Sequence, residues 1–178
     1  MLPQIRLLRR NDSPAPRPRR RPAARPPSYY RVAGIDLAAE LERLCRLEEL
    51  GGPGGRLATG PPELAIRRAS KRPRSRLGFA VPDENRISVT AYPAIRRGDV
   101  LETLLHELVH IAVGPATEGR RWHGREFTTT LRAAMAEAYG ISGVGARSSY
   151  HGVYAEAIEA RIAAPGRQQA PLPLAASG

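Results

Sequence analysis

The sequence predicts one small α+β domain between two disordered ends. Three stretches of apolar residues have the spacing of helices, and a segment after the first is rich in β-branched residues with polar alternation. The ends differ in composition: residues 1–27 contain eight Arg, seven Pro and one acid, and residues 165–178 are rich in Pro, Ala and Gln. Such segments bury too little apolar surface to offset the entropy lost on ordering. We therefore expect the domain to span residues 28–164.

The first predicted helix runs from Leu37 to Leu50. Asp36 precedes it and can accept hydrogen bonds as its N-cap, and four glycines among residues 51–55 end it. Cys45 lies on this helix, where we expect it to be a small core residue. It is the one cysteine of the chain, so an intramolecular disulfide is excluded. One face of the helix is apolar and is formed by Leu37, Leu41, Leu44 and Leu47.

A β-hairpin is predicted next. Leu77 to Val81 is a short apolar run, and Arg86 to Tyr92 alternates β-branched and polar residues. The residues between them, Pro82 to Asn85, have the composition of a turn. We expect two antiparallel strands joined by this turn.

A second predicted helix runs from Val100 to Val113. Asp99 at the N-cap and Glu102 at the third helical position have the spacing of a capping box, and Gly114 followed by Pro supplies the stop signal. The helix is apolar on nearly every side, which predicts that it is buried.

His106, Glu107 and His110 form an H-E-x-x-H motif in this helix. Residues i and i+4 lie on one helix face, so both imidazoles can bind one metal ion with the glutamate beside it. An unpaired buried polar group costs about 1–3 kcal/mol, and a metal ion would satisfy these side chains together. The motif predicts a zinc hydrolase with a carboxylate base. The alternative is two core histidines bonded to backbone and a solvated glutamate.

A catalytic zinc site needs a third protein ligand and keeps a fourth position for water. His123, thirteen residues after His110, is the leading candidate, and Glu126 and Glu137 are the alternatives. A metzincin ligand set is excluded because its third histidine would fall at Ala116. His123 precedes a third predicted helix, which ends at Gly140 and carries an apolar stripe of Phe127, Leu131, Met135 and Tyr139.

The run from Leu104 to His110, followed by His123-Gly124-Arg125-Glu126-Phe127, resembles the SprT-like metallopeptidases, whose pattern is H-E-x-x-H, a variable loop and H-G-x-x-F. In that family a helix with a Gly-rich turn leads to a strand, a short hairpin and the metal-binding helix. This chain offers the helix described above, Glu63 to Ala69, and Leu77 to Tyr92 in that order, so the resemblance covers residues 30–140.

The resemblance implies a small zincin-like metallopeptidase domain with a short three-stranded sheet, in which the metal-binding helix packs against the following helix. It implies Zn²⁺ held by His106, His110 and His123, and peptide-bond hydrolysis by metal-activated water with Glu107 as catalytic base. The implied partner is a protein or peptide substrate. Arg86 to Tyr92 is a candidate edge strand for binding an extended substrate, with an ordinary core strand as the equal alternative. Tyr150, His151 and Tyr154 are candidate donors to the oxyanion, and a solvated loop is the alternative.

Two arginine-rich segments carry most of the net charge of +11, the N-terminal arm and residues 67–76. Such segments bind nucleic acid through phosphate contacts, which suggests DNA-associated proteins as substrates. The alternative is a solvated face in a chain with 27 arginines and one lysine, which indicates a general bias toward Arg. No aromatic residues interleave with these segments, so base stacking is not indicated.

The chain has no C-x-x-C pair, so it lacks the zinc ribbon that some SprT-like proteins carry, which weakens any inference of a role in DNA repair. It has neither a secretion signal nor an apolar membrane span, so we expect a cytoplasmic protein without membrane contact. Two other functions stay open. One is a regulatory peptidase that cleaves a dedicated partner such as a repressor, and the other is a non-enzymatic, zinc-stabilised nucleic-acid-binding protein. Manganese or iron could replace zinc.

Overall fold

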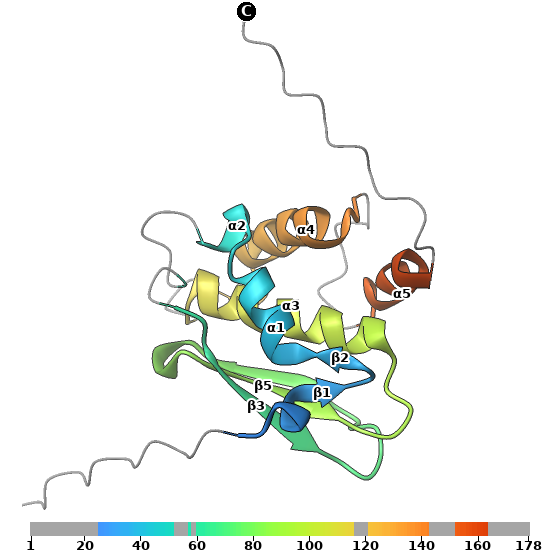
Figure 1. Ribbon diagram of the computed structural model, residues 1–178. Coiled ribbons are helices and arrows are strands. Elements are labelled where there is room, and N and C mark those ends of the chain that lie inside the picture. The colour runs from blue at the N-terminus through green and yellow to red at the C-terminus, as the bar shows by residue number, and fades with distance from the viewer. Residues whose placement is uncertain (1–24, 52–56, 58–59, 116–120, 143–151, 164–178) are drawn as a thin grey trace, which may run out of the picture.

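The computed structural model describes residues 25–51, 57, 60–115, 121–142 and 152–163. The predicted N-terminal arm up to residue 24 and the predicted tail from residue 165 lie outside the described residues. The described part is α+β, as predicted, with helices stacked on one side of a small sheet (Figure 1). None of its helices combines the length and the apolar character that crossing a bilayer requires.

The sheet contains three strands in the order β3-β5-β4. β3 (Glu63–Arg68) is parallel to β5 (Arg86–Ala91), and β4 (Gly78–Val81) pairs antiparallel with β5. The hairpin turn is the short 3-10 helix η3 (Pro82–Glu84), and Asn85 closes it in the left-handed region at φ 45°. The predicted hairpin is therefore confirmed. For Arg86 to Tyr92 the alternative of an ordinary core strand is confirmed and the candidate edge strand is wrong, because β5 lies in the centre and β4 is the edge.

The N-terminal region is more broken than predicted. It contains η1 (Pro27–Tyr30) and a two-residue hairpin of β1 (Arg31–Val32) and β2 (Ile35–Asp36). Asp36 is the N-cap of α1 (Leu37–Leu44), where its carboxylate accepts hydrogen bonds from two backbone amides, as predicted. The prediction of one helix to Leu50 is wrong, because a turn separates α1 from α2 (Glu48–Gly51). The carboxylate of Glu137 caps α2 by accepting from the amides of its first two residues at 2.8 and 3.2 Å.

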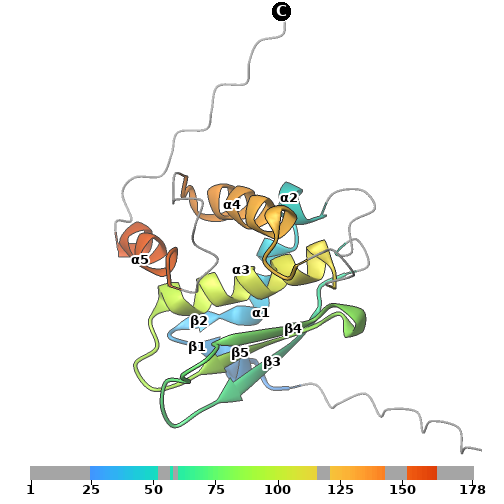
Figure 2. The same cartoon turned by 180° about the vertical axis from the view of Figure 1, so that it is seen from behind.

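The metal-motif helix α3 (Arg97–Val113) runs through the middle of the molecule. It lies between the sheet and α4 (Arg125–Tyr139), and α5 (Ala155–Ala163) packs against its N-terminal half (Figures 1 and 2). Every residue from Gly98 to Ile111 is buried, which confirms the buried helix inferred from its apolar circumference. α3 ends at Gly114 and α4 at Gly140, as predicted.

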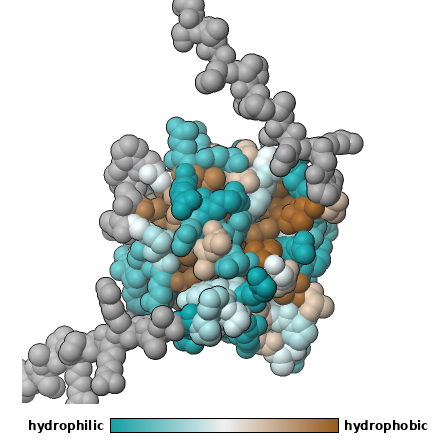
Figure 3. All heavy atoms as spheres, viewed as in Figure 1, coloured by the Kyte–Doolittle hydropathy of each residue, from teal (hydrophilic) through white to brown (hydrophobic). Residues whose placement is uncertain are grey.

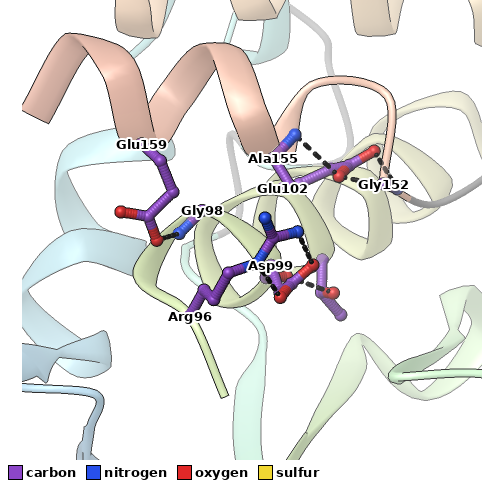
Figure 4. A network of polar contacts seen from close by, with 8 residues as sticks. Arg96, Gly98, Asp99, Glu102, Gly152, Ala155 and Glu159 are labelled. Carbon is purple, nitrogen blue, oxygen red and sulfur yellow. Dashed lines mark hydrogen bonds and ion pairs between the residues drawn. The ribbon is translucent and has the colours of Figure 1, made fainter. Parts of the chain in front are cut away.

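The predicted capping box at the start of α3 is wrong, because the helix begins three residues earlier, at Arg97. Asp99 lies in the first turn and forms a two-pronged ion pair with Arg96, at 2.9 and 3.1 Å. The Glu102 carboxylate accepts hydrogen bonds from the amides of Gly152 and Ala155 (Figure 4). Both carboxylates therefore find partners outside the predicted cap, and Glu102 joins α3 to the start of α5.

α5 lies close to α3 at Gly98. A methyl group at this position would overlap the carbonyl of Ala155, and the Gly98 amide donates to the Glu159 carboxylate at 2.6 Å (Figure 4). The face of the molecule seen in Figure 3 is largely hydrophilic, and the largest of its hydrophobic areas lies on the side of α5. These contacts fix the N-terminal half of the metal-motif helix.

Candidate metal centre

Three histidine side chains converge at one point. The Nε2 atom of His123 lies 3.2 Å from the Nε2 atoms of both His106 and His110, and the ligand atoms of all three lie within 4.8 Å of one another. Two nitrogens bound to one tetrahedral zinc, each at about 2.0–2.1 Å, are separated by about 3.3 Å. The spacing and the chemistry of these donors fit a metal ion.

Two elements position the three imidazoles. His106 and His110 lie on consecutive turns of α3, and both are buried. His123 lies just before α4, in a turn that the Gly124 amide closes by donating to the Arg121 carbonyl at 3.1 Å. His123 is exposed as a residue, yet partial burial of its ring lowers its pKa, which favours the neutral form that binds metal.

Phe127 forms the floor of the histidine cluster. Its ring centroid lies 4.8, 4.3 and 4.8 Å from those of His106, His110 and His123. The ring is 1 % exposed, and it stands on the first turn of α4. Phe127 therefore packs against all three candidate ligands and limits the rotation of their rings. From the sequence, Phe127 is predicted only as part of the apolar stripe of its helix.

Glu107 lies beside the cluster and is 4 % exposed. Burial raises its pKa to about 8, and the positive charge of Arg76 acts in the opposite direction. A divalent cation held by the neighbouring histidines would lower this pKa, because it would stabilise the carboxylate. The side chain lines the same cavity as the three histidines.

The cavity has a volume of about 660 Å³ and opens between α3, β4 and the turn before α4. Phe79 of β4 and Trp122 of the turn before α4 both line the cavity, and they are 46 % and 47 % exposed. Trp122 also packs edge-on against His110, with ring centroids 5.4 Å apart. The cavity thus contains the candidate metal site and two exposed aromatic side chains. Its other described lining residues are Ser75, Arg76, Gly78 and Ala80.

Gly78 is a site residue that the sequence analysis missed. A Cβ built there would lie 2.5 Å from Glu107 Oε1 and 2.6 Å from Thr103 Cγ2. β4 can therefore approach α3 this closely only because residue 78 has no side chain. A glycine within a predicted strand is a signal of close backbone approach, and this signal could have identified it.

The alternative site residues lie elsewhere. Glu137 caps α2, and Glu126 is exposed on α4 and does not belong to the cluster. Tyr154 is buried in the hydrophobic core and does not line the cavity, so it is not the oxyanion donor considered for it. Tyr150 and His151 lie outside the described residues.

The fold and the site define an α+β protein with a three-histidine candidate metal centre and an adjacent buried carboxylate. A family model described as the SprT-like family matches residues 56–148, just over half of the chain, and the chain belongs to this family. SprT-like proteins are generally associated with zinc metallopeptidase function. No curated protein and no solved structure matches the chain. α5 lies beyond the matched residues.

Proposed function

We propose that this chain is a zinc-dependent metalloendopeptidase with a zincin-like domain over residues 28–164. The observation that carries the proposal is the placement of three imidazole nitrogens and a buried carboxylate on one open cavity. A purely structural zinc site is closed by four protein ligands, whereas a hydrolytic site has three and an open position. Among the described residues the cluster contains His106, His110 and His123 and no fourth ligand.

Each residue has a defined role in the proposed reaction. His106, His110 and His123 would hold the metal as neutral imidazoles. The bound metal would supply Lewis acidity, which would lower the pKa of a water molecule toward neutrality and polarise the scissile carbonyl. Glu107 accepts the proton of the attacking water on a carboxylate oxygen and delivers it to the leaving amine.

We also propose that β4 binds the substrate. It is the edge strand on the cavity side of the sheet, and Gly78, Phe79 and Ala80 line the cavity. An extended peptide can pair with such an edge by main-chain hydrogen bonds, which would lay its scissile bond across the cavity. The strand that we propose to bind the substrate is thus β4, the hairpin partner of β5.

The decisive experiment is Glu107→Gln, assayed on casein and on a DNA-bound protein. We expect the variant to retain about one zinc per chain and to lose at least about a hundredfold in cleavage rate, the usual contribution of a general base. His123→Ala is the matched variant, and its zinc content by elemental analysis should fall well below one. Equal cleavage by the wild type and Glu107→Gln would refute the mechanism.

The same variant separates the alternative functions. A non-enzymatic protein with zinc in a structural role would show no difference between the wild type and Glu107→Gln in any binding assay, and neither would cleave casein. A regulatory peptidase would cleave its dedicated partner and leave casein intact. The family membership favours a peptidase over a non-enzymatic protein.

DNA is a further proposed partner, because the six cations of residues 67–76 are all exposed and the end of this segment lines the cavity. DNA bound there would bring its attached proteins to the site. Adding duplex DNA at low salt should then raise the cleavage rate of a DNA-bound protein, and the gain should fall steeply as salt rises. A rate indifferent to DNA would remove this partner.

A further inference from the structure

Arg76 is the cation on the wall of the cavity. It lies just before β4, its side chain is exposed, and its guanidinium carbon is 5.0 Å from the ring centroid of Phe79. Stacking on an aromatic face holds a guanidinium in place without using its hydrogen-bond donors. The group is therefore positioned at the rim with its donors available to a ligand.

Arg76 has no ion-pair partner among the described residues, although its charge acts on the buried carboxyl of Glu107. Arg43, Arg86 and Arg96 each form an ion pair with a nearby carboxylate, but no carboxylate of the described residues forms one with Arg76. Among the residues that the structure describes, Glu107 is the only acidic one that lines the cavity, and it is buried. Residues 67–76 contain six cations and no acid. The rim on this side is thus positively charged.

We propose that Arg76 selects peptide substrates that carry an Asp or Glu side chain beside the scissile bond. A carboxylate entering the rim can receive two parallel hydrogen bonds from the guanidinium, whereas a Lys or Arg side chain in the same place meets a like charge. This inference rests on the proposed peptidase function. It adds the chemical class of the substrate and the residue that recognises it.

The test uses fluorogenic peptides of one length that contain a single variable residue, which is Glu, Gln or Lys. Separate peptides place this residue at each of the positions on either side of the scissile bond. The wild type should show its highest kcat/KM for Glu at one of these positions. Arg76→Gln should lower the Glu-to-Lys ratio about fivefold, as expected for one partly exposed ion pair, and Arg76→Glu should invert it. Arg74→Gln is the matched control, because this exposed arginine of the same segment does not line the cavity, and it should leave the ratio unchanged.

Binding gives a second readout that does not depend on turnover. The affinity of the Glu peptide for Glu107→Gln, measured by fluorescence anisotropy, should exceed that of the Lys peptide at low salt, and adding Arg76→Gln should remove the difference. A double variant carrying Arg74→Gln instead should keep it.

Three outcomes would overturn the inference. The first is a Glu-to-Lys ratio that Arg76→Gln leaves unchanged. The second is an equal loss of kcat for all peptides, which would assign Arg76 to the reaction instead of to selection. The third is an Arg76→Gln variant that binds a duplex oligonucleotide more weakly but binds the acidic peptide as tightly as the wild type. Absence of cleavage of every peptide by the wild type, with Arg76-dependent binding intact, would instead refute the peptidase function.

Discussion

Gly78→Ala should damage the reaction while leaving the metal site intact. The added Cβ would lie 2.6 Å from Glu107 Cγ and 2.6 Å from Thr103 Cγ2. Carbon atoms in ordinary contact are about 3.5–4.0 Å apart, so the overlap is about 1 Å. Neither atom is at the free end of a long side chain, so β4 or α3 must move.

The size of the effect follows from this overlap. Overpacking of a well-packed core costs about 1–3 kcal/mol, and a misplacement of about 1 Å at a reacting group can cost about a hundredfold in rate. We expect Gly78→Ala to lower the free energy of unfolding, measured in urea, by about 1–3 kcal/mol. It should also lower kcat/KM on a peptide by about a hundredfold. Zinc content should stay near one per chain, because the three atoms nearest to the added Cβ belong to Glu107 and Thr103 and not to the histidines.

A second variant tests the cause. Thr103→Ser removes the clashing methyl group and retains the hydroxyl, which donates to the Asp99 carbonyl at 2.6 Å. The double variant of Gly78→Ala and Thr103→Ser should recover part of the lost stability, with a coupling energy of about 1 kcal/mol in a double-mutant cycle. Wild-type stability and rate in Gly78→Ala alone would show that the strand does not need a glycine here, and the reasoning would fail.

Phe127→Ala should lower the free energy of unfolding by about 3–5 kcal/mol and weaken zinc affinity in a chelator competition, because it removes the ring that contacts all three histidines. Phe127→Leu should have smaller effects. Unchanged zinc affinity in both variants would show that the Phe127 ring does not support the metal site. Asp99→Asn tests the ion pair with Arg96, whose hydrogen bonds hold the pKa of Asp99 below its usual value. The Asp99 carboxylate therefore stabilises the fold above its unfolded-state pKa and loses this effect as the pH falls through its folded-state pKa. Asp99→Asn should be less stable than the wild type by about 0.5–1 kcal/mol at pH 7, and the difference should vanish in acid. A difference in urea unfolding that does not change with pH would contradict this prediction. Burial raises the pKa of Cys45 to about 11, so at pH 8 its alkylation by iodoacetamide should be about a hundredfold slower in the folded chain than in urea, as followed by mass spectrometry, and equal rates would contradict the burial.

Features that depend on neighbouring residues in the chain could be predicted from the sequence. The hairpin from Leu77 to Tyr92, the ends of α3 and α4 at glycine, and the N-cap at Asp36 are all set by local backbone chemistry. The burial of α3 followed from its apolar circumference. The spacing of His106 and His110 fixed their common face, because helix geometry alone determines it.

Features that depend on contacts distant in sequence could not be predicted. The order of strands in the sheet is one, since β5 has the same alternation of residue types whether it lies at an edge or in the centre. The partners of buried carboxylates are another. Glu102 has the spacing of a capping residue, but the amides that it binds lie 50 and 53 residues further along the chain. Gly78 and Arg76 meet the site only because β4 folds under α3.

The polar residues of α3 explain how a helix buried on every side keeps one orientation. Asp99 binds Arg96 at its first turn, Glu102 binds the start of α5 one turn later, and the two histidines face the turn before α4. Glu102, His106 and His110 are spaced at i, i+4 and i+8, so their side chains lie along one face of the helix and meet partners on α5 and on the turn before α4. A rotation of α3 would disturb its close packing and would also leave several buried polar groups unpaired at about 1–3 kcal/mol each. Glu102, whose partners lie on another element, thus helps to fix the angle at which α3 presents His106, Glu107 and His110 to the cavity.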